Sequence, residues 1–244
     1  MSVQALQSVA HTTPAAPGAR YDVYAGIHKA LRLLMTRTLV RVGATDPADA
    51  AEVAATLAEV DGLLGLCELH LADENGFVHP ALERARAGSA ARIAAEHVHH
   101  AEAIADLRDL AALAAHSVDA ARAAALTRLY HALALFVADN LQHMNYEETA
   151  HNALLWSAYT DAELAAIEQA IVASIPPQAM AAALHAFFPA LNAPERAAMA
   201  AGMRASGMPA DAFAGVLGIA ECTLAAGDFT KLQRDLAHAA PSAG

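Results

Sequence analysis

Two segments of this 244-residue chain repeat one arrangement of polar residues on a helix face that is otherwise apolar. HLADENGFVHPAL begins at His70 and HMNYEETAHNAL begins at His143, and each has a glutamate four residues after its first histidine. His143 and Glu147 continue the three-and-four spacing that starts at the apolar residue Phe136, so they share its helix face. A buried carboxylate without a partner would cost several kcal/mol. The negative charge of the Glu147 carboxylate must therefore be neutralised by another group.

The rest of the chain predicts an all-α protein. Alanine is abundant, aromatic residues make up 5% of the chain, and no stretch alternates apolar and polar residues as a strand would. We expect an antiparallel up-down four-helix bundle, because long helical segments are joined by short turns. The predicted domains are a disordered tail at 1–20, the bundle at 21–159 and an extension of short helices at 160–244.

Local signals give the expected limits of these helices. The first helix should run from 21 to 42 and end at Gly43, and Asp46 should cap the second helix, which bends or breaks near Asn75 and Gly76. A third helix is expected at 92–115 and a fourth up to about 159. Thr160 should cap the next segment, after which prolines separate short helices that pack on the bundle or against a second copy of the chain in a homodimer.

Charge and hydropathy exclude several classes of partner. The formal net charge is −11 and no basic cluster is present, so we expect neither nucleic acid nor an anionic membrane surface as a partner. No apolar run reaches the roughly 18 residues that a membrane helix needs. The first residues lack a positive segment followed by an apolar one, which predicts a cytoplasmic protein.

A second spacing repeats along with the first. His28 lies 42 residues before His70, and His100 lies 43 residues before His143. Each half of the bundle would thus contribute one histidine from its first helix and a His-x-x-x-Glu pair, His70 with Glu74 or His143 with Glu147, from its second helix. Imidazoles around two carboxylates suit two first-row metal ions, with the carboxylates as bridges.

The sequence does not decide which histidine of the third helix is a ligand. In RIAAEHVHHAEAIADL, His97 and His100 share the apolar face, whereas His99 points to the flank. The repeat favours His100 as a ligand, with His97 as a provisional second ligand one turn earlier. His79 and His151 follow the two chelating pairs. They could line an access route or hydrogen-bond to ligands, or they could face solvent at a helix end.

The pattern of His28, His70-x-x-x-Glu74, a histidine early in the third helix, and His143-x-x-x-Glu147 resembles the hemerythrin-like, or HHE cation-binding, family. The resemblance covers about residues 21–157. It implies a four-helix bundle with two non-haem iron ions. By position, the resemblance implies the ligand set His28, His70, Glu74, His97, His100, His143 and Glu147. Manganese and zinc also suit such donors.

The chain departs from the oxygen-carrying members in two places. Those members have two histidines four residues apart on the third helix, whereas here the residue four before His100 is Glu96. They also use His-x-x-x-x-Asp on the fourth helix, where this chain has Glu148. Both differences bring the site nearer to carboxylate-richer regulatory and repair-type relatives.

These observations predict a metal-binding protein that binds or senses oxygen, nitric oxide or iron. A di-iron oxidase or peroxidase, or an enzyme that handles nitric oxide, is the first alternative, with Tyr146 or His151 as proton donor. A structural helical protein whose site is vestigial or holds zinc is the second. A ferritin-like site ranks lower, because it requires a glutamate on the first helix and residues 21–42 contain none.

Overall fold

The computed structural model describes residues 20–238, and none of these residues lies in a β-strand. The all-α prediction is therefore confirmed. The predicted tail at 1–20 lies outside the described residues, except for Arg20. The chain divides into two compact units. We call residues 31–151 the bundle unit, and residues 1–30 with 152–244 the terminal unit. The domain limits expected from the sequence stay a prediction.

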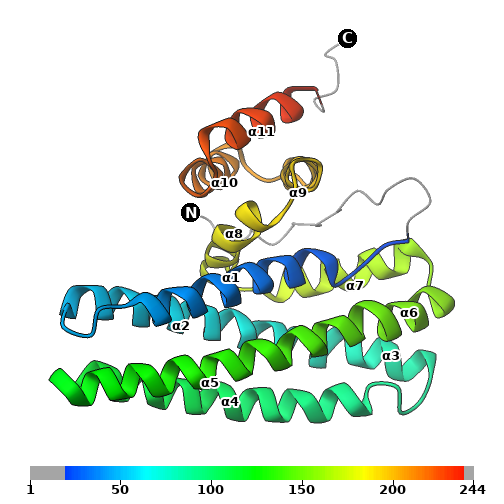
Figure 1. Ribbon diagram of the computed structural model, residues 1–244. Helices are drawn as coiled ribbons and strands as arrows, with labels where there is room; N and C mark the ends of the chain where they lie inside the picture. The colour runs from blue at the N-terminus through cyan, green and yellow to red at the C-terminus, as the bar shows by residue number, and fades with distance from the viewer. Residues whose placement is uncertain (1–19, 239–244) are drawn as a thin grey trace. The chain divides into compact units, whose positions relative to one another are not determined.

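Long helices build the bundle unit (Figure 1). They are α1 (Ala25–Ala44), which enters this unit at Leu31, α2 (Ala50–Asp73), α4 (Ala91–His116) and α5 (Asp119–Tyr146). Helix α4 packs against both α2 and α5. Between α1 and α2, the side-chain hydroxyls of Thr45 and Thr56 are hydrogen-bonded at 2.8 Å.

The start of α2 differs from the expected one. The carboxylate of Asp49 accepts hydrogen bonds from the backbone N–H groups of Ala51 and Glu52, so Asp49 is the N-cap. Asp46, the predicted cap, instead accepts a bond from the N–H of Ala48 in the preceding turn. An aspartate caps a helix only where the chain is extended just before the first turn, and Asp49 has that conformation.

Each of the two polar repeats contains a π-helical turn that begins at its glutamate. The turn η2 (Glu74–Val78) follows α2 and leads directly into α3 (His79–Ala85). The turn η3 (Glu147–His151) follows α5 in the same way. The predicted break near Asn75 and Gly76 is thus a widened turn within a helix that continues. Wide turns of this kind are rare and occur mostly at functional sites.

The interior of the bundle unit is apolar over most of its length. Side chains with less than 2% exposure include Leu64 on α2, Ile93 and Leu107 on α4, and Leu129 and Leu133 on α5. Close packing of these side chains holds the helices in register. On α4 the buried residues His97 and His100 lie between Ile93 and Leu107, so the polar group interrupts this apolar interior. These polar side chains are therefore held in place by the surrounding core.

The terminal unit contains the remaining helices. They are α6 (Asn152–Ala158), α7 (Asp161–Ser174), α8 (Pro177–Ala190), α9 (Ala193–Ala205), α10 (Ala210–Thr223) and α11 (Ala226–His238). Thr160 caps α7 in a capping box with Glu163, as predicted. Helix α11 was not predicted. Helix α8 packs against α10, and α9 packs against α11. Arg20 donates hydrogen bonds to the backbone oxygens of Trp156 and Tyr159, at 2.7 and 2.6 Å.

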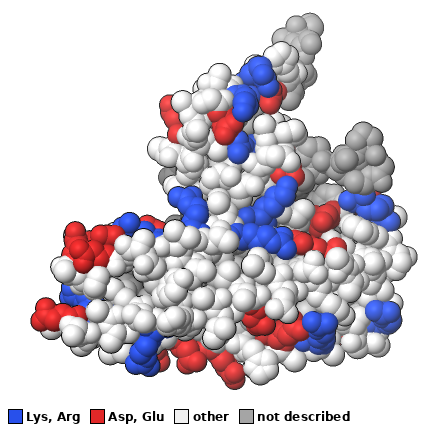
Figure 2. Space-filling view, viewed as in Figure 1, with Lys and Arg blue, Asp and Glu red and all other residues white. Residues whose placement is uncertain are grey.

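Several charged side chains on the bundle unit form ion pairs. Much of the face seen in Figure 2 carries no charge, and basic and acidic side chains lie side by side at several points. The charged groups of Arg41 and Glu52 are 3.5 Å apart, and those of Arg92 and Glu96 are 2.8 Å apart. Among residues 20–238, no helix is long and apolar enough to cross a membrane.

Candidate metal centre

Two glutamates meet in the interior of the bundle unit. Glu74 begins η2 and Glu147 begins η3, and their exposed fractions are 3% and 0%. A carboxylate oxygen of each lies within 4.8 Å of one of the other. Two buried carboxylates at that separation repel each other strongly unless protons or cations lie between them. This pair is the electrostatic centre of the site.

Imidazole nitrogens surround the two carboxylates. Nε2 of His70 is 3.4 Å from Glu74, Nε2 of His97 is 3.2 Å from Glu74, and Nε2 of His143 is 3.4 Å from Glu147. Nε2 of His97 and Nε2 of His143 are 3.3 Å apart. Neighbouring donors around one cation lie about 3.0–3.4 Å apart when the bonds measure about 2.1 Å. The spacing of these donors therefore fits metal ligation.

Two of these rings are oriented by hydrogen bonds on their far side. Nδ1 of His97 lies 2.8 Å from the side-chain oxygen of Asn75, and Nδ1 of His143 lies 2.9 Å from a carboxylate oxygen of Glu96. Both partners are acceptors, so each Nδ1 carries the proton and donates it. Each Nε2 then has a lone pair directed at the carboxylates. Metal-binding histidines are typically held in this way.

His79 joins this group from the end of η2. One of its ring nitrogens lies within 4.8 Å of donor atoms of Glu74, His97 and Glu147. Its ring stacks on that of His97, with centroids 4.8 Å apart. Burial, followed by the nearby His97, lowers the pKa of His79 to about 4. The imidazole is therefore neutral at pH 7, which is the form that binds a metal.

The charges around His143 also favour a bound cation. Burial lowers the pKa of His143, but hydrogen bonding and attraction from Glu147, with a further bond to Glu96, outweigh it and raise the pKa. A positive charge next to Glu147 is thus favourable, and either a proton or a bound cation would supply it. His70, Glu74 and Glu147 also satisfy the same 4.8 Å limit among themselves. Two overlapping donor groups hence share the two glutamates.

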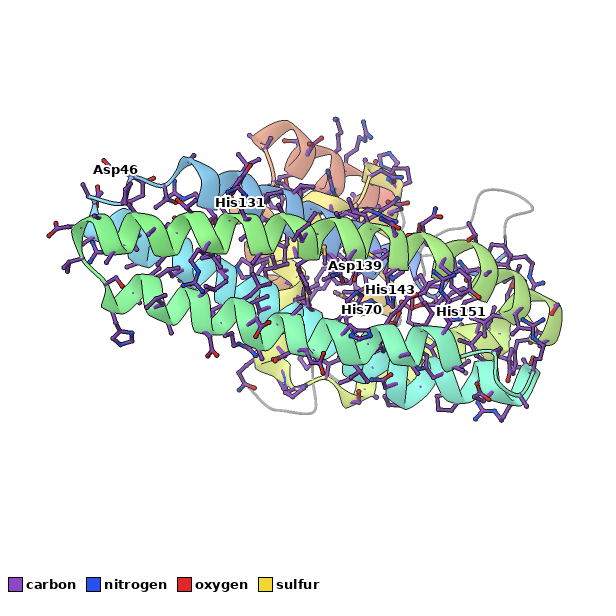
Figure 3. The ribbon with its side chains drawn as sticks, turned by 60° about the horizontal axis from the view of Figure 1, so that its bottom comes forward. Asp46, His70, His131, Asp139, His143 and His151 are labelled. Atoms are coloured by element: carbon purple, nitrogen blue, oxygen red, sulfur yellow. The ribbon has the colours of Figure 1, made fainter. Side chains whose placement is uncertain are left out.

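His100 lies beside the group, with its Nε2 turned outward. That Nε2 is 2.9 Å from Asp139, a side chain that is 66% exposed. The His100 ring packs edge-on against the ring of His143, with centroids 4.6 Å apart. Figure 3 shows Asp139, His70 and His143 in the same part of the bundle, whereas Asp46 and His131 lie farther along it. Nε2 of His100 is therefore directed at a surface carboxylate.

The other predicted positions are also located. His28 is fully buried on α1 in the terminal unit, where its ring stacks on Tyr24 with centroids 5.2 Å apart. His151 is buried at the end of η3, with its ring 5.3 Å from that of Tyr146 and 6.5 Å from that of His79. Four histidines expected to be solvated are indeed exposed: His99, His116, His185 and His238. His11 lies outside the described residues.

Comparison with known families decides the assignment. Residues 20–154 match the model of the hemerythrin HHE cation binding domain, which covers more than half of the chain. The chain belongs to the hemerythrin HHE family. No curated protein and no solved structure matched it. Membership of the hemerythrin family and the cluster of histidines and glutamates together indicate a metal-binding helical protein.

The sequence did not predict the contacts that His79, Glu96 and Asp139 make in this hemerythrin site. His79 is five residues from Glu74, and in an α-helix of 3.6 residues per turn that spacing turns a side chain about 140° away. Only the π-turn returns His79 to the face of Glu74. Glu96 and Asp139 were likewise not expected to contact histidines, because both contacts cross between α4 and α5. Helical periodicity carries no signal for such pairs.

Proposed function

We propose that this hemerythrin-family protein holds two iron ions in the bundle and uses them to bind or sense oxygen, nitric oxide or iron itself. The observation that carries the proposal is the convergence of Glu74 and Glu147, two buried carboxylates surrounded by imidazole nitrogens. Carboxylates that meet in this way suit a bridging role between two first-row cations. The metal charge would offset the repulsion between them.

The ligands divide into two sets around the shared glutamates. His97 and His143 supply one set, because their Nε2 atoms converge at 3.3 Å and their Nδ1 atoms are held by Asn75 and Glu96. His70 belongs to the other set. We favour His97 over His100 on the third helix, because Nε2 of His97 lies 3.2 Å from Glu74 and His100 belongs to neither donor group found among residues 20–238.

His28 is proposed as a further imidazole ligand, on the evidence of its helix face and the sequence repeat. It lies three residues before Leu31 and seven before Met35, so one face of the continuous helix α1 carries all three side chains. Leu31 and Met35 are both buried. The repeat of 42 and 43 residues supports the same assignment, since it pairs His28 with His70 in the first half of the bundle.

Iron in such a site would supply an open coordination position and a change of oxidation state for a small diatomic molecule. The protein itself orients the imidazoles through Asn75 and Glu96 and keeps bulk water away with the surrounding core. Arg92 lies outside this arrangement, where it pairs with Glu96 and stacks over the ring of Tyr146 at 4.1 Å. Arg92 therefore helps to hold Glu96 against His143.

Iron quantitation joined to absorption spectroscopy tests the proposal. We expect two iron ions per chain after anaerobic loading with Fe(II), and a near-ultraviolet charge-transfer band that develops on exposure to oxygen or nitric oxide. Zinc or manganese at the same stoichiometry in protein purified from iron-replete cells would replace iron in the proposal. Less than about one metal ion per chain, with no such band, would contradict it and favour a vestigial site.

An oxidase or peroxidase is the second candidate, and one contact favours it. The ring of Tyr146 packs edge-on against that of His151, which lies next to His79 at the edge of the site. A phenol and an imidazole in this position could deliver protons to a bound substrate. Steady turnover of hydrogen peroxide that falls when Tyr146 is replaced by Phe would support this activity over reversible binding.

A further inference from the structure

The two polar repeats are not equivalent, because their last histidines lie at different distances from the glutamates. His79 is five residues after Glu74, whereas His151 is four residues after Glu147. Both pairs are joined by a π-helical turn, in which each backbone N–H bonds to the carbonyl five residues earlier. The N–H of His79 makes that bond to the carbonyl of Glu74.

Residues joined by such a bond lie one above the other, as residues four apart do in an α-helix. His79 is therefore placed directly over Glu74, and one of its ring nitrogens comes within 4.8 Å of donor atoms of Glu74, His97 and Glu147. His151 stops one residue short of the equivalent place. It belongs to neither donor group found among the described residues.

The environment of His79 lacks the hydrogen bond that a buried ring nitrogen normally has. Its Nε2 is buried and has no hydrogen-bond partner among residues 20–238, and the side chain as a whole is 93% buried, with 7% exposure. Leaving such an atom unsatisfied carries the full cost of removing it from water. Two carboxylates and another imidazole lie beside this ring, and a cation bound among these donors would give the buried nitrogen a partner.

We propose that His79 is a third imidazole ligand of the cation bound by His97 and His143, so that the two cations of the site are chemically unequal. This inference rests on the proposed function, since it assumes that two cations bind. The cation bound by His97 and His143 then has three imidazole ligands, one more than the sequence repeat alone would give it. The π-turn η2 is the backbone feature that makes this difference, by placing His79 over Glu74.

Two variants test the assignment, with Fe(II) as the probe. His79→Gln removes the imidazole and leaves a side chain of similar polarity, and His151→Gln is the matched control at the end of the other π-turn. Each is loaded anaerobically with ⁵⁷Fe(II), passed over a desalting column with a weak chelator, and analysed for iron by mass spectrometry. We expect two iron ions in the wild type and the control, and about one in His79→Gln, whose second site should bind more than roughly 100-fold more weakly.

Mössbauer spectra of the wild-type protein give a measurement that needs no variant. Two quadrupole doublets of equal area and different splitting are expected, one for each cation, and circular dichroism confirms that each variant is folded. A single doublet in the wild type overturns the proposal, as does His79→Gln that keeps two iron ions with unchanged spectra. A wild type that binds fewer than two cations overturns the proposed function instead, which separates the two failures.

Discussion

At the residue scale, the site depends on which nitrogen of each ring is already used. In His97 and His143 the hydrogen bond that Nδ1 donates leaves Nε2 facing the glutamates, whereas in His100 Nε2 donates to Asp139 and the buried Nδ1 has no hydrogen-bond partner among residues 20–238. A histidine on the correct helix face is therefore not enough. The hydrogen bond on the far side of the ring decides whether a lone pair reaches the interior.

Glu96 offers a direct test of this orientation. Its carboxylate accepts the Nδ1 proton of His143 at 2.9 Å, so Glu96→Ala should weaken binding of Fe(II) or Zn(II) about 10–100-fold. Glu96→Gln keeps an acceptor oxygen and should lose less. Competition with a chromophoric chelator measures both affinities.

The control for Glu96 lies on the same helix. Glu102 is 70% exposed, and its carboxylate lies 3.6 Å from Nδ1 of His99, a side chain that is 76% exposed. Glu102→Ala should leave metal affinity unchanged, because an exposed pair of this kind contributes little. Equal affinities for Glu96→Ala and Glu102→Ala would show that Glu96 does not orient His143.

At the element scale, the bundle is shaped by how closely its helices approach. A methyl group added at Gly43 on α1 would lie 2.9 Å from Cε2 of Tyr130 on α5, which is shorter than van der Waals contact. The same group added at Gly65 on α2 would meet nothing within 4 Å. The first glycine therefore allows two helices to meet, and the second has no such role.

Alanine substitutions at these glycines should have opposite effects. Gly65→Ala should raise the free energy of unfolding by about 0.5–1 kcal/mol, because alanine has the higher helix propensity. Gly43→Ala should give no gain or a loss, because the ring of Tyr130 must move. Urea denaturation followed by circular dichroism measures both. A similar gain at both positions would mean that α1 and α5 are not in close contact at Gly43.

At the scale of the whole molecule, the two buried glutamates serve the proposed metal site but destabilise the metal-free fold. Glu74 and Glu147 are more than 95% buried and their oxygens approach within 4.8 Å. Such a pair destabilises the metal-free protein and stabilises the loaded one. A chain selected only for stability would not keep both carboxylates at this place.

Removing one carboxylate should therefore stabilise the metal-free protein but take away most of the stability that metal adds to the wild type. Without metal at pH 8, Glu147→Gln should raise the free energy of unfolding by roughly 1 kcal/mol or more, because the repulsion disappears. With Fe(II) at 100 times the dissociation constant, the wild type should gain about 2.7 kcal/mol and the variant little. Anaerobic urea titrations with and without metal measure these changes.

Glu148→Gln is the matched control, because its carboxylate lies next in sequence but pairs with Arg32. Glu148→Gln should show the same increase in the free energy of unfolding on adding Fe(II) as the wild type. If Glu147→Gln were less stable than the wild type without metal, the carboxylate of Glu147 would be stabilising the fold itself and not serving a cation.

The sequence by itself determined the helical class, the limits of most helices and the two His-x-x-x-Glu pairs. These features are local: apolar periodicity, capping residues and four-residue chelating pairs all operate within one helix. That is why the capping of α7 by Thr160 could be predicted, and why spacing alone was enough to propose His70 with Glu74 and His143 with Glu147 as pairs of ligands.

Tertiary structure decided the rest of the site. The π-turn that returns His79 to the face of Glu74 breaks the α-helical period from which faces are predicted. The bond from His143 to Glu96, and that from His100 to Asp139, join α5 to α4, and no spacing along one helix encodes them. Side chains 39 or more residues apart meet only when the helices pack, so their roles follow from the core and not from the pattern.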